Sequence, residues 1–293
     1  MITSPPHPSG PRTAVVTVSY GSAEVLPAFL DSLPAASIRP LVVVVADNKA
    51  NSADDVTALA QTHGAQHLPM ETNVGYGAAM NAAIDSLPST VEWVLIANPD
   101  LVVSAGTLDT LITIGDQDQR IGAVGPATLT SEGNLYPSAR AVPSLRNGIG
   151  HALFANLWIG NPWSRAYRHD AVAPTRRDAG WLSGACVLVR RSAFDEAGGF
   201  DPEFFMYFED VDLGYRLGKL GYRNVYEPAA VVTHTGAHST ASHSGAMITA
   251  HHESARRFLN KKYSGALLWP VRAALTVGLK LRSALLLRRV GRE

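Results

Sequence analysis

The stretch LVVVVADN (41–48) is a run of aliphatic residues that ends in two polar ones. Runs of this kind are typical of strands that are buried on both faces of a parallel sheet. TAVVTVSY (13–20) and WVLIANPD (93–100) have the same form. Helical patterns lie between these runs, one after Ser52 and one in NVGYGAAMNAAI (73–84). The alternation predicts an α/β fold with a mostly parallel, Rossmann-like central sheet flanked by helices.

Each of these three runs ends in polar side chains. They are Ser19 and Tyr20, Asp47 and Asn48, and Asn98 and Asp100. In open parallel sheets, ligands bind beyond the carboxyl ends of the strands. We therefore expect a binding site at this edge of the sheet.

The composition argues against several classes of protein. A chain of 293 residues, of which 46% are hydrophobic, can form one large α/β domain or two small ones. Its 25 Lys and Arg balance its 25 Asp and Glu, so no overall charge favours nucleic acid as a partner. The single cysteine, Cys186, excludes an intramolecular disulfide and fits a reducing compartment. The chain has no run of about 20 apolar residues, so the sequence predicts no membrane span.

In FFMYFEDVDL (204–213), an aromatic cluster is followed by the carboxylates Glu209, Asp210 and Asp212. Acidic side chains at this spacing repel one another and lose free energy when they are desolvated. The segment could be a solvated helix start, where carboxylates favour the positive end of the backbone dipole. It could also be a site where one carboxylate meets a cation or a hydroxyl proton.

Three common ligand-binding motifs do not fit the chain. A dinucleotide fold needs G-x-G-x-x-G after the first strand, whereas SYGSAE (19–24) has a single glycine. An EF-hand loop counted from Asp210 has Gly221 where a bidentate Glu is needed. Four histidines follow His234 without a thiol and match no standard zinc spacing. They are His238, His243, His251 and His252.

Gly75 and Gly77 open the helical pattern of residues 73–84. Glycines at a helix start allow a phosphate to approach the free backbone N–H groups. A tight turn alone would also require them, so both interpretations stay open at this point.

In order along the chain, the motifs resemble the inverting glycosyltransferases of family 2, which have a GT-A fold. The resemblance covers roughly residues 13–260. It is carried by VVTVSYGS, VVVADNKANSADD, ETNVGYGAAMNAAI, WVLIANPDL, the stretch from WLSGACVLVRR to AAVVTH, and RRFLNKKY. GGFDPEFFMYFEDVDL (198–213) is its most specific element. Within the family, the chain is most similar to rhamnosyltransferases of actinobacterial cell-wall assembly.

The resemblance implies a nucleotide site and a metal site. The sugar nucleotide would bind at Ser19, Tyr20, Asp47, Asn48, Asn73, Gly75, Gly77, Asn81 and Asn98. NPD (98–100) stands where the family has its D-x-D motif, so Asp100 and His234 would bind Mn²⁺ or Mg²⁺. Asn98 replaces the first acid, which would weaken the metal site or limit Asn98 to a hydrogen bond with a sugar or ribose.

The resemblance also places the catalytic base in the pair Glu209 and Asp210, and we predict that Asp210 is the base. An inverting transfer needs one carboxylate to take the proton of the acceptor hydroxyl. Neighbouring acids would raise the pKa of that base, and the aromatic cluster would exclude water. We expect Asp212, Trp181 and Gly184 on the acceptor side or behind the catalytic pair.

The implied function is a metal-dependent, inverting transfer of a sugar to a polyprenyl-diphosphate-linked saccharide. The expected donor is dTDP-L-rhamnose. A UDP-sugar donor stays open because thymine and uracil present the same imide edge. A catalytically inactive sugar-nucleotide-binding protein is an alternative that is suggested only by the presence of Asn98 in place of an acid. A nicotinamide-dependent oxidoreductase is disfavoured because its glycine motif is missing.

The expected domain division begins with a flexible tail at residues 1–12, which lacks the apolar core of a signal peptide. A nucleotide-binding half, about 13–130, and an acceptor half, about 131–263, form one glycosyltransferase domain. Within the second half we expect an irregular insertion over 137–179. WLSGACVLVRR (181–191) is then expected as a strand, and residues 223–236 as a strand pair.

The remaining residues, 264–293, alternate aliphatic and basic side chains. Basic amphipathic helices lie in membrane interfaces and favour anionic lipids. We therefore expect a cytoplasmic enzyme that is peripheral on the inner face of the cell membrane. In the alternative, this helix packs on the domain itself or on a second copy in a homodimer.

Overall fold

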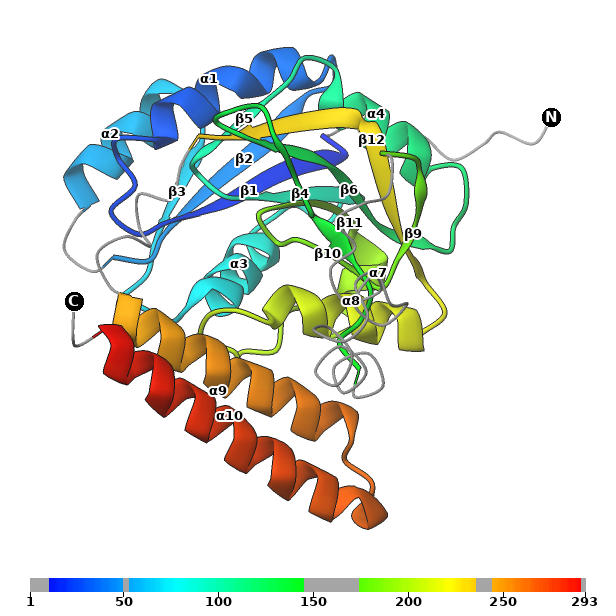
Figure 1. The fold of residues 1–293 in the computed structure, drawn as a ribbon. Helices are drawn as coiled ribbons and strands as arrows, with labels where there is room; N and C mark the ends of the chain where they lie inside the picture. The colour runs from blue at the N-terminus through cyan, green and yellow to red at the C-terminus, as the bar shows by residue number, and fades with distance from the viewer. Residues whose placement is uncertain (1–10, 50–52, 145–173, 236–243, 291–293) are drawn as a thin grey trace.

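In a computed structural model of the chain, the structure describes residues 11–49, 53–144, 174–235 and 244–290. The order of the main sheet is β3-β2-β1-β4-β11-β6-β12-β5, with β7 and β9 paired at its side (Figure 1). Its strands are β1 (Thr13–Ser19), β2 (Leu41–Asp47), β3 (Gln66–Pro69), β4 (Trp93–Ala97), β5 (Leu101–Val103), β6 (Ile121–Thr130), β7 (Leu135–Tyr136), β9 (Arg177–Ala179), β11 (Cys186–Arg190) and β12 (Arg223–His234). The short strands β8 (Ala139–Arg140) and β10 (Trp181–Leu182) form a second sheet.

The predicted α/β architecture is confirmed. Strands β3, β2, β1 and β4 are parallel neighbours, as expected from the three apolar runs. Strands β6 and β12 are also parallel, while β11 and β5 pair with their neighbours in the antiparallel direction. The first half of the chain therefore forms the parallel part of the sheet, and the second half extends it with mixed pairing.

Helices cover both faces of this sheet (Figure 1). One face is covered by α1 (Leu26–Ala36), α2 (Ala53–Thr62) and α4 (Thr107–Gly115). The other is covered by α3 (Tyr76–Asp85), α7 (Arg191–Glu196) and α8 (Glu209–Lys219). Successive side chains of each strand point to opposite faces of the sheet, and each face has its own hydrophobic core. Val15 therefore packs in one core and Val16 in the other. Continuous apolar runs form these strands because both faces are buried.

Two expected strands differ from the prediction. Residues 223–234 form the single strand β12 and not a strand pair, with a register shift between Glu227 and Val231. Pro228 lies in that interval and has no N–H for the ladder, which accounts for a bulge there. Residues 181–191 are divided into β10 and β11 by a turn at Gly184. The Gly184 N–H bonds to a side chain and not to a neighbouring strand.

The C-terminal residues form two long helices, α9 (Ser244–Lys262) and α10 (Trp269–Val290), joined by a short 3-10 turn at Ala266–Leu268. Figure 1 shows them side by side below the sheet. Phe258 of α9 is fully buried against the domain, whereas no described side chain of α10 is buried. No helix in the described part of the chain is long and apolar enough to cross a membrane.

Residues 269–290 of the tail form the helix α10, and the amphipathic character predicted for the tail is not confirmed. At 100° per residue, the aliphatic and basic residues of α10 fall on all sides of its axis, so the helix has no single apolar face. Three other predictions concern residues outside the described ranges. They are the tail at 1–12, of which only residues 11 and 12 are described, the insertion over 137–179, of which residues 145–173 are not described, and His238 and His243.

Candidate active site

The three polar strand ends meet at one edge of the sheet. Strand β1 lies between β2 and β4, with Ser19 opposite Asp47 and Thr17 opposite Ala97. The side chains of Ser19 and Asp47 are buried, while Tyr20 is 52% exposed. Asp47 therefore places a carboxylate under this edge, and Tyr20 offers an accessible ring for a planar ligand.

Asn48 connects the end of β2 to the loop before α3. Its Nδ2 donates to Asn73 Oδ1 at 2.9 Å and to Gly75 O at 3.3 Å, and its Oδ1 accepts from Val74 N–H at 3.0 Å. The Asn48 side chain is buried. All three hydrogen bonds of its amide are made within the protein, and they stabilise the loop before α3. Asn73 is exposed and lies on the outer side of that loop.

The glycines of the loop accommodate protein backbone at close range. Gly75 has φ +86°, and a Cβ there would lie 2.4 Å from Phe205 O. A Cβ on Gly77 would lie 3.0 Å from Phe200 Cβ. Tyr76 N–H donates to Phe205 O at 3.1 Å. In the structure, both glycines let the segment before α8 pack on the start of α3.

Asn81, on α3, stabilises the segment before α8 through the backbone of Phe200. Its Nδ2 donates to Phe200 O at 2.8 Å, and its Oδ1 accepts from Phe200 N–H at 2.9 Å. These two bonds occupy both ends of the amide. Asn81 thus holds the GGF turn, which leads into the acidic helix, and is not directed outward.

Asp100 and His234 lie together, as the resemblance implies. Strands β5 and β12 pair with His234 opposite Leu101, which brings His234 Nε2 to 3.4 Å from Asp100 Oδ1. Cis ligands of one octahedral cation lie about 3 Å apart, so these two atoms fit a shared Mn²⁺ or Mg²⁺. Among the described residues, no three His, Cys, Asp or Glu side chains group closely enough to hold a metal. Any cation here would therefore need ligand oxygens or water as well. Asn98, half-buried, donates its N–H to Ala185 O.

The two catalytic candidates stand at the first turn of α8, after a strained bend. Tyr207 and Phe208 have φ of 68° and 67°, a conformation that L-residues rarely adopt. Asp210 Oδ2 accepts from Gly184 N–H at 2.9 Å, and its Oδ1 accepts from Val211 N–H at 2.8 Å. Asp210 is half-buried, whereas Glu209 is only 7% exposed. Asp210 is thus the more accessible of the two carboxylates.

Burial and mutual repulsion raise both acid pKa values. Burial, followed by the charge of Asp210, raises the pKa of Glu209 to about 8. Burial also raises the pKa of Asp210, although its N–H bonds from Gly184 and Val211 oppose the shift. Burial thus favours a protonated carboxyl in this pair, because two adjacent carboxylates are not readily charged together. Protonation of one of the two acids would relieve the repulsion expected from the sequence.

Asp212 takes part in a partly exposed ion cluster with Arg216 and Lys261. It is fully buried, with Arg216 Nε 2.6 Å from Oδ2 and Lys261 Nζ 2.9 Å from Oδ1. Lys261 of α9 also binds Asp201 at 2.8 Å. Trp181 packs on the other side of α8, where a Cβ on Gly214 would meet the Trp181 Cβ at 2.6 Å. Both residues support α8.

Two residues near the catalytic pair were missed in the sequence. The Tyr76 hydroxyl donates to Gly184 O at 2.7 Å, and burial followed by the charge of Glu209 and of Asp210 raises its pKa well above the usual range. Arg140 of β8 is the cation whose charge lowers the pKa of Asp210. The guanidinium of Arg140 lies 5.8 Å from the Trp181 ring. No short-range pattern marks either residue, since both reach the site through distant strand and helix packing.

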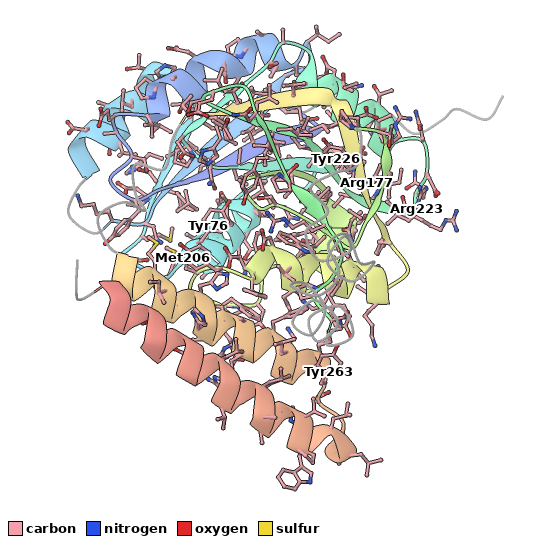
Figure 2. The ribbon with its side chains drawn as sticks, in the orientation of Figure 1. Tyr76, Arg177, Met206, Arg223, Tyr226 and Tyr263 are labelled. Atoms are coloured by element: carbon pink, nitrogen blue, oxygen red, sulfur yellow. The ribbon has the colours of Figure 1, made fainter. Side chains whose placement is uncertain are left out.

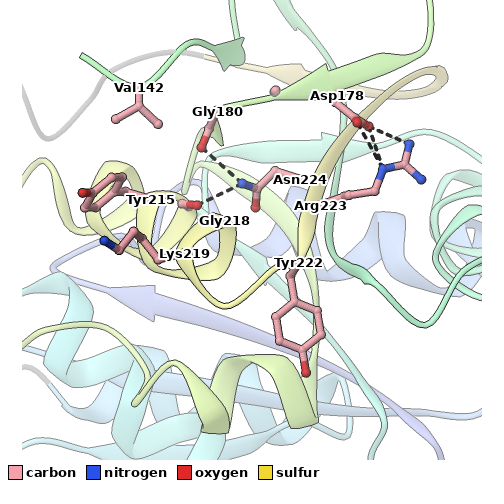
Figure 3. A pocket seen from close by; sticks show the side chains of 11 residues that line it. Val142, Asp178, Gly180, Tyr215, Gly218, Lys219, Tyr222, Arg223 and Asn224 are labelled. Carbon is pink, nitrogen blue, oxygen red and sulfur yellow. Dashed lines mark hydrogen bonds and ion pairs between the residues drawn. The ribbon is translucent and has the colours of Figure 1, made fainter. Parts of the chain in front are cut away.

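The segment just before α8 contacts the helix α9. Figure 2 labels Met206, in the segment between Phe205 and Tyr207, close to the start of α9. Ser254 Oγ donates to Met206 O at 2.8 Å, and the rings of Tyr207 and His251 lie 5.5 Å apart. A separate cavity of about 350 Å³ lies further along α8, beside Tyr215, Lys219 and Asn224 (Figure 3). Neither Glu209 nor Asp210 lines it.

The sequence was compared with those of known proteins. Residues 11–252 match the model of the family described as "Glycosyltransferase like family 2". An N-acetylglucosaminyl-diphospho-decaprenol L-rhamnosyltransferase of Mycobacterium tuberculosis (strain ATCC 25618 / H37Rv) is 43% identical over 283 residues, which is 94% of this chain and 92% of the relative. The rhamnosyltransferase WbbL of Escherichia coli (strain K12) is 25% identical, covering 85% of this chain and 92% of its own length.

Solved structures agree on the fold. The mannosyltransferase PcManGT from Pyrobaculum calidifontis, in complex with GDP-Man and Mn²⁺, superposes with a TM-score of 0.59 at 19% identity. That match covers 97% of this chain and 74% of the mannosyltransferase. GalNAc-T7 with UDP, GalNAc and Mn²⁺ gives a TM-score of 0.60 at 15% identity, covering 84% of this chain and 47% of GalNAc-T7. The predicted family and its fold are therefore confirmed, and the chain belongs to glycosyltransferase family 2.

Proposed function

We propose that this glycosyltransferase moves L-rhamnose from dTDP-L-rhamnose to an N-acetylglucosaminyl-diphospho-polyprenol. The observation that carries the proposal is the 43% identity to the mycobacterial relative, which extends over nearly the whole of both chains. That relative's name states both the sugar and the lipid-linked acceptor. The Escherichia coli relative is also named a rhamnosyltransferase.

The proposed chemistry places the base on Asp210. Its carboxylate is held by two backbone N–H groups, from Gly184 and Val211, so it has a fixed orientation. It would take the proton of the acceptor hydroxyl while that oxygen attacks the anomeric carbon from the face opposite the leaving diphosphate. This geometry inverts the anomeric configuration. Glu209 would stay protonated, which keeps the Asp210 charge free of a second negative neighbour.

Asp100 and His234 are proposed to hold a divalent cation, Mn²⁺ or Mg²⁺. The 3.4 Å separation of their ligand atoms and the carboxylate–imidazole donor set support this assignment. When bound, such a cation neutralises charge on the leaving diphosphate. Asn98 lies two residues from Asp100 and is proposed to bind a ribose or sugar hydroxyl, since a neutral amide binds a divalent cation less strongly than a carboxylate does.

The nucleoside is proposed to bind over Asp47 and Tyr20. A buried carboxylate accepts a hydrogen bond from an imide N–H, which thymine and uracil both have. The exposed Tyr20 ring would stack on the base. Asn73 would contact the ribose or diphosphate from the adjoining loop.

We also propose that the enzyme is peripheral on the inner face of the cell membrane, with the α9–α10 turn as the contact. Leu267 is 94% exposed and Trp269 is 64% exposed at this turn. Arg272 donates to Tyr263 O and Gly265 O at 2.8 Å, which keeps the turn rigid. Exposed Leu and Trp side chains on a rigid turn are suited to a lipid interface, where the acceptor would be located.

The donor is tested by a thermal-shift panel of dTDP, UDP, GDP and dTDP-rhamnose, each with Mn²⁺, Mg²⁺ or EDTA. A ligand that binds the folded state raises the melting temperature by mass action. A metal-dependent shift with the dTDP ligands alone is expected. A shift with UDP alone would move the donor to a UDP-sugar, and no shift with any nucleotide would contradict the proposed enzyme.

Activity is tested with synthetic N-acetylglucosaminyl-diphospho-polyprenol and dTDP-rhamnose. Formation of a rhamnosyl product of inverted configuration is expected. Binding of dTDP-rhamnose without turnover on this acceptor would favour an inactive sugar-nucleotide-binding protein or a different acceptor, and acceptors with other sugars at the diphosphate would separate these outcomes.

Membrane contact is tested by flotation with vesicles that contain phosphatidylglycerol. The double variant Leu267→Glu with Trp269→Glu is expected to lose binding. The control, Ile38→Glu, changes a side chain that is 96% exposed on another surface and should bind normally. Retained binding of the double variant would contradict this contact. A change from dimer to monomer in the same variant would instead identify the turn as a subunit interface.

A further inference from the structure

Asp47 has a histidine neighbour that the proposed reaction does not explain. His67 Nε2, on β3, lies 3.5 Å from Asp47 Oδ2. The side chains are 13% and 2% exposed, so the pair is shielded from solvent. Strands β2 and β3 are parallel with Val45 opposite His67, and Val45 and Asp47 share a face of the sheet. The register of the sheet thus directs His67 toward the carboxylate.

A threonine lies beside the other ring nitrogen of His67. Thr57, on α2, places its Oγ1 3.2 Å from His67 Nδ1. When the hydroxyl donates to Nδ1, the neutral imidazole carries its proton on Nε2, facing Asp47. Nε2 is buried and makes no hydrogen bond to the described residues, so Asp47 Oδ2 at 3.5 Å is an ion-pair neighbour. Thr57, His67 and Asp47 therefore form a row of polar contacts between a helix and two strands.

We propose that His67 is a positioning residue for nucleotide recognition, which orients the Asp47 carboxylate toward the base. This inference rests on the proposed function, in which Asp47 accepts the imide N–H of the base. Lys49 N–H contacts Asp47 Oδ1 at 3.3 Å, and His67 faces Oδ2. With one neighbour at each oxygen, the carboxylate is oriented from two sides, and the base would meet it at the edge of the sheet.

The ligand class follows from this arrangement. A fixed and buried acceptor selects a base with an N–H at that edge, such as thymine or uracil. A base with a ring nitrogen acceptor there, such as cytosine, would leave two acceptors opposed without a proton. The chain from Thr57 to Asp47 thus contributes to base selection without contact between His67 and the nucleotide.

The test measures dTDP affinity by calorimetry in two matched pairs of variants. His67→Leu removes the donor at similar volume, and His67→Gln keeps an N–H that can reach Asp47. Thr57→Val removes the hydroxyl at equal shape, and Thr57→Ser keeps it. We expect His67→Leu and Thr57→Val to weaken dTDP binding about tenfold, the scale of one hydrogen bond to a charged group. His67→Gln and Thr57→Ser should stay within about threefold of the wild type.

A modified ligand separates positioning from simple packing. N3-methyl-dTDP lacks the imide proton, so we expect all four variants and the wild type to bind it with equal, weak affinity. The KM for the donor should rise in His67→Leu while kcat at saturating donor is unchanged.

Each of the other outcomes overturns a distinct claim. Equal dTDP binding by wild type, His67→Leu and Thr57→Val would show that His67 has no positioning role, while the proposed function would stand. An equal loss for dTDP and N3-methyl-dTDP would show that His67 only supports the fold. If the wild type binds neither dTDP nor UDP, the proposed function fails, and the role of His67 falls with it.

Discussion

The N–H of Gly184 donates to Asp210 Oδ2 at 2.9 Å, and this bond joins the turn between β10 and β11 to the first turn of α8. A Cβ at residue 184 would lie 3.2 Å from the Asp210 Cβ, so only glycine lets the two segments approach this closely without adjustment. The Tyr76 hydroxyl binds the carbonyl of the same glycine at 2.7 Å. The orientation of the proposed base is therefore set by three segments that are distant in sequence.

Asp210→Asn should lower kcat by about 10²- to 10⁴-fold, because the amide keeps the shape of the side chain but cannot accept the acceptor proton. The affinity for dTDP should change little. Initial rates and calorimetry on the same preparation provide the measurement. Glu209→Gln is the matched control: Gln resembles a protonated Glu, so its kcat should fall much less. A larger loss in Glu209→Gln than in Asp210→Asn would transfer the role of base to Glu209.

Glu209→Gln should also change how stability depends on pH. The pKa of Glu209 is raised to about 8 in the folded protein, above its value in the unfolded chain. Folding thus favours the protonated form, and this contribution is complete below the unfolded pKa and lost as pH rises toward 8. The variant lacks this loss. Its melting temperature relative to wild type should rise between about pH 5 and pH 8. A difference that is constant across this range would contradict the raised pKa.

Gly75→Ala should destabilise the protein more than an ordinary left-handed glycine does. Its φ is +86°, and the added Cβ would lie 2.4 Å from Phe205 O. Gly64 is the control, because it has φ +65° with nothing within 4 Å of the added Cβ. We expect a loss of about 1–2 kcal/mol in Gly64→Ala from the backbone alone, and at least about 3 kcal/mol in Gly75→Ala. Urea unfolding measures both, and equal losses would contradict the close packing of Phe205.

Lys261→Met should weaken the connection between α9 and α8. Asp212 is fully buried and would keep only Arg216 as a charged partner, so a loss of about 2–3 kcal/mol in the free energy of unfolding is expected. Arg256→Met is the control on the same helix, because Arg256 pairs with the exposed Glu253. That surface pair should contribute at most about 0.5–1 kcal/mol. Equal effects in urea unfolding would show that the ion pair of Lys261 with Asp212 adds no more stability than the surface pair.

His234→Ala should raise the metal concentration that gives half-maximal activity by at least about tenfold, since one of two proposed protein ligands is lost. Asn98→Asp should lower it, because it restores a second acid near Asp100. Metal titrations after EDTA treatment provide the measurement. The assignment of the metal site would be wrong if His234→Ala left the titration unchanged while the protein stayed folded.

The sequence by itself determined the parts of the protein that depend on local pattern. Apolar runs fixed the positions of β1, β2 and β4, because a strand buried on both faces must be apolar throughout. The polar residues that end these runs, such as Asp47, had to meet at one edge once the strands were parallel. The pattern of adjacent acids after an aromatic cluster marked Glu209 and Asp210 as a candidate site or a solvated helix start, and only the family resemblance placed the catalytic base there.

The tertiary structure alone decided what each of these residues contacts. Gly75 was compatible with a phosphate or a turn in the sequence, and it packs against Phe205, which is 130 residues away. Asn48 and Asn81 were expected to bind the nucleotide, but their amides bind backbone groups of neighbouring loops. No sequence pattern around Arg140 indicates that it lies close enough to Asp210 to lower the pKa of that carboxyl. Hydrophobic periodicity records which face of an element is buried, but it does not record which distant segment covers that face, and the contacts of the active site are made between such segments.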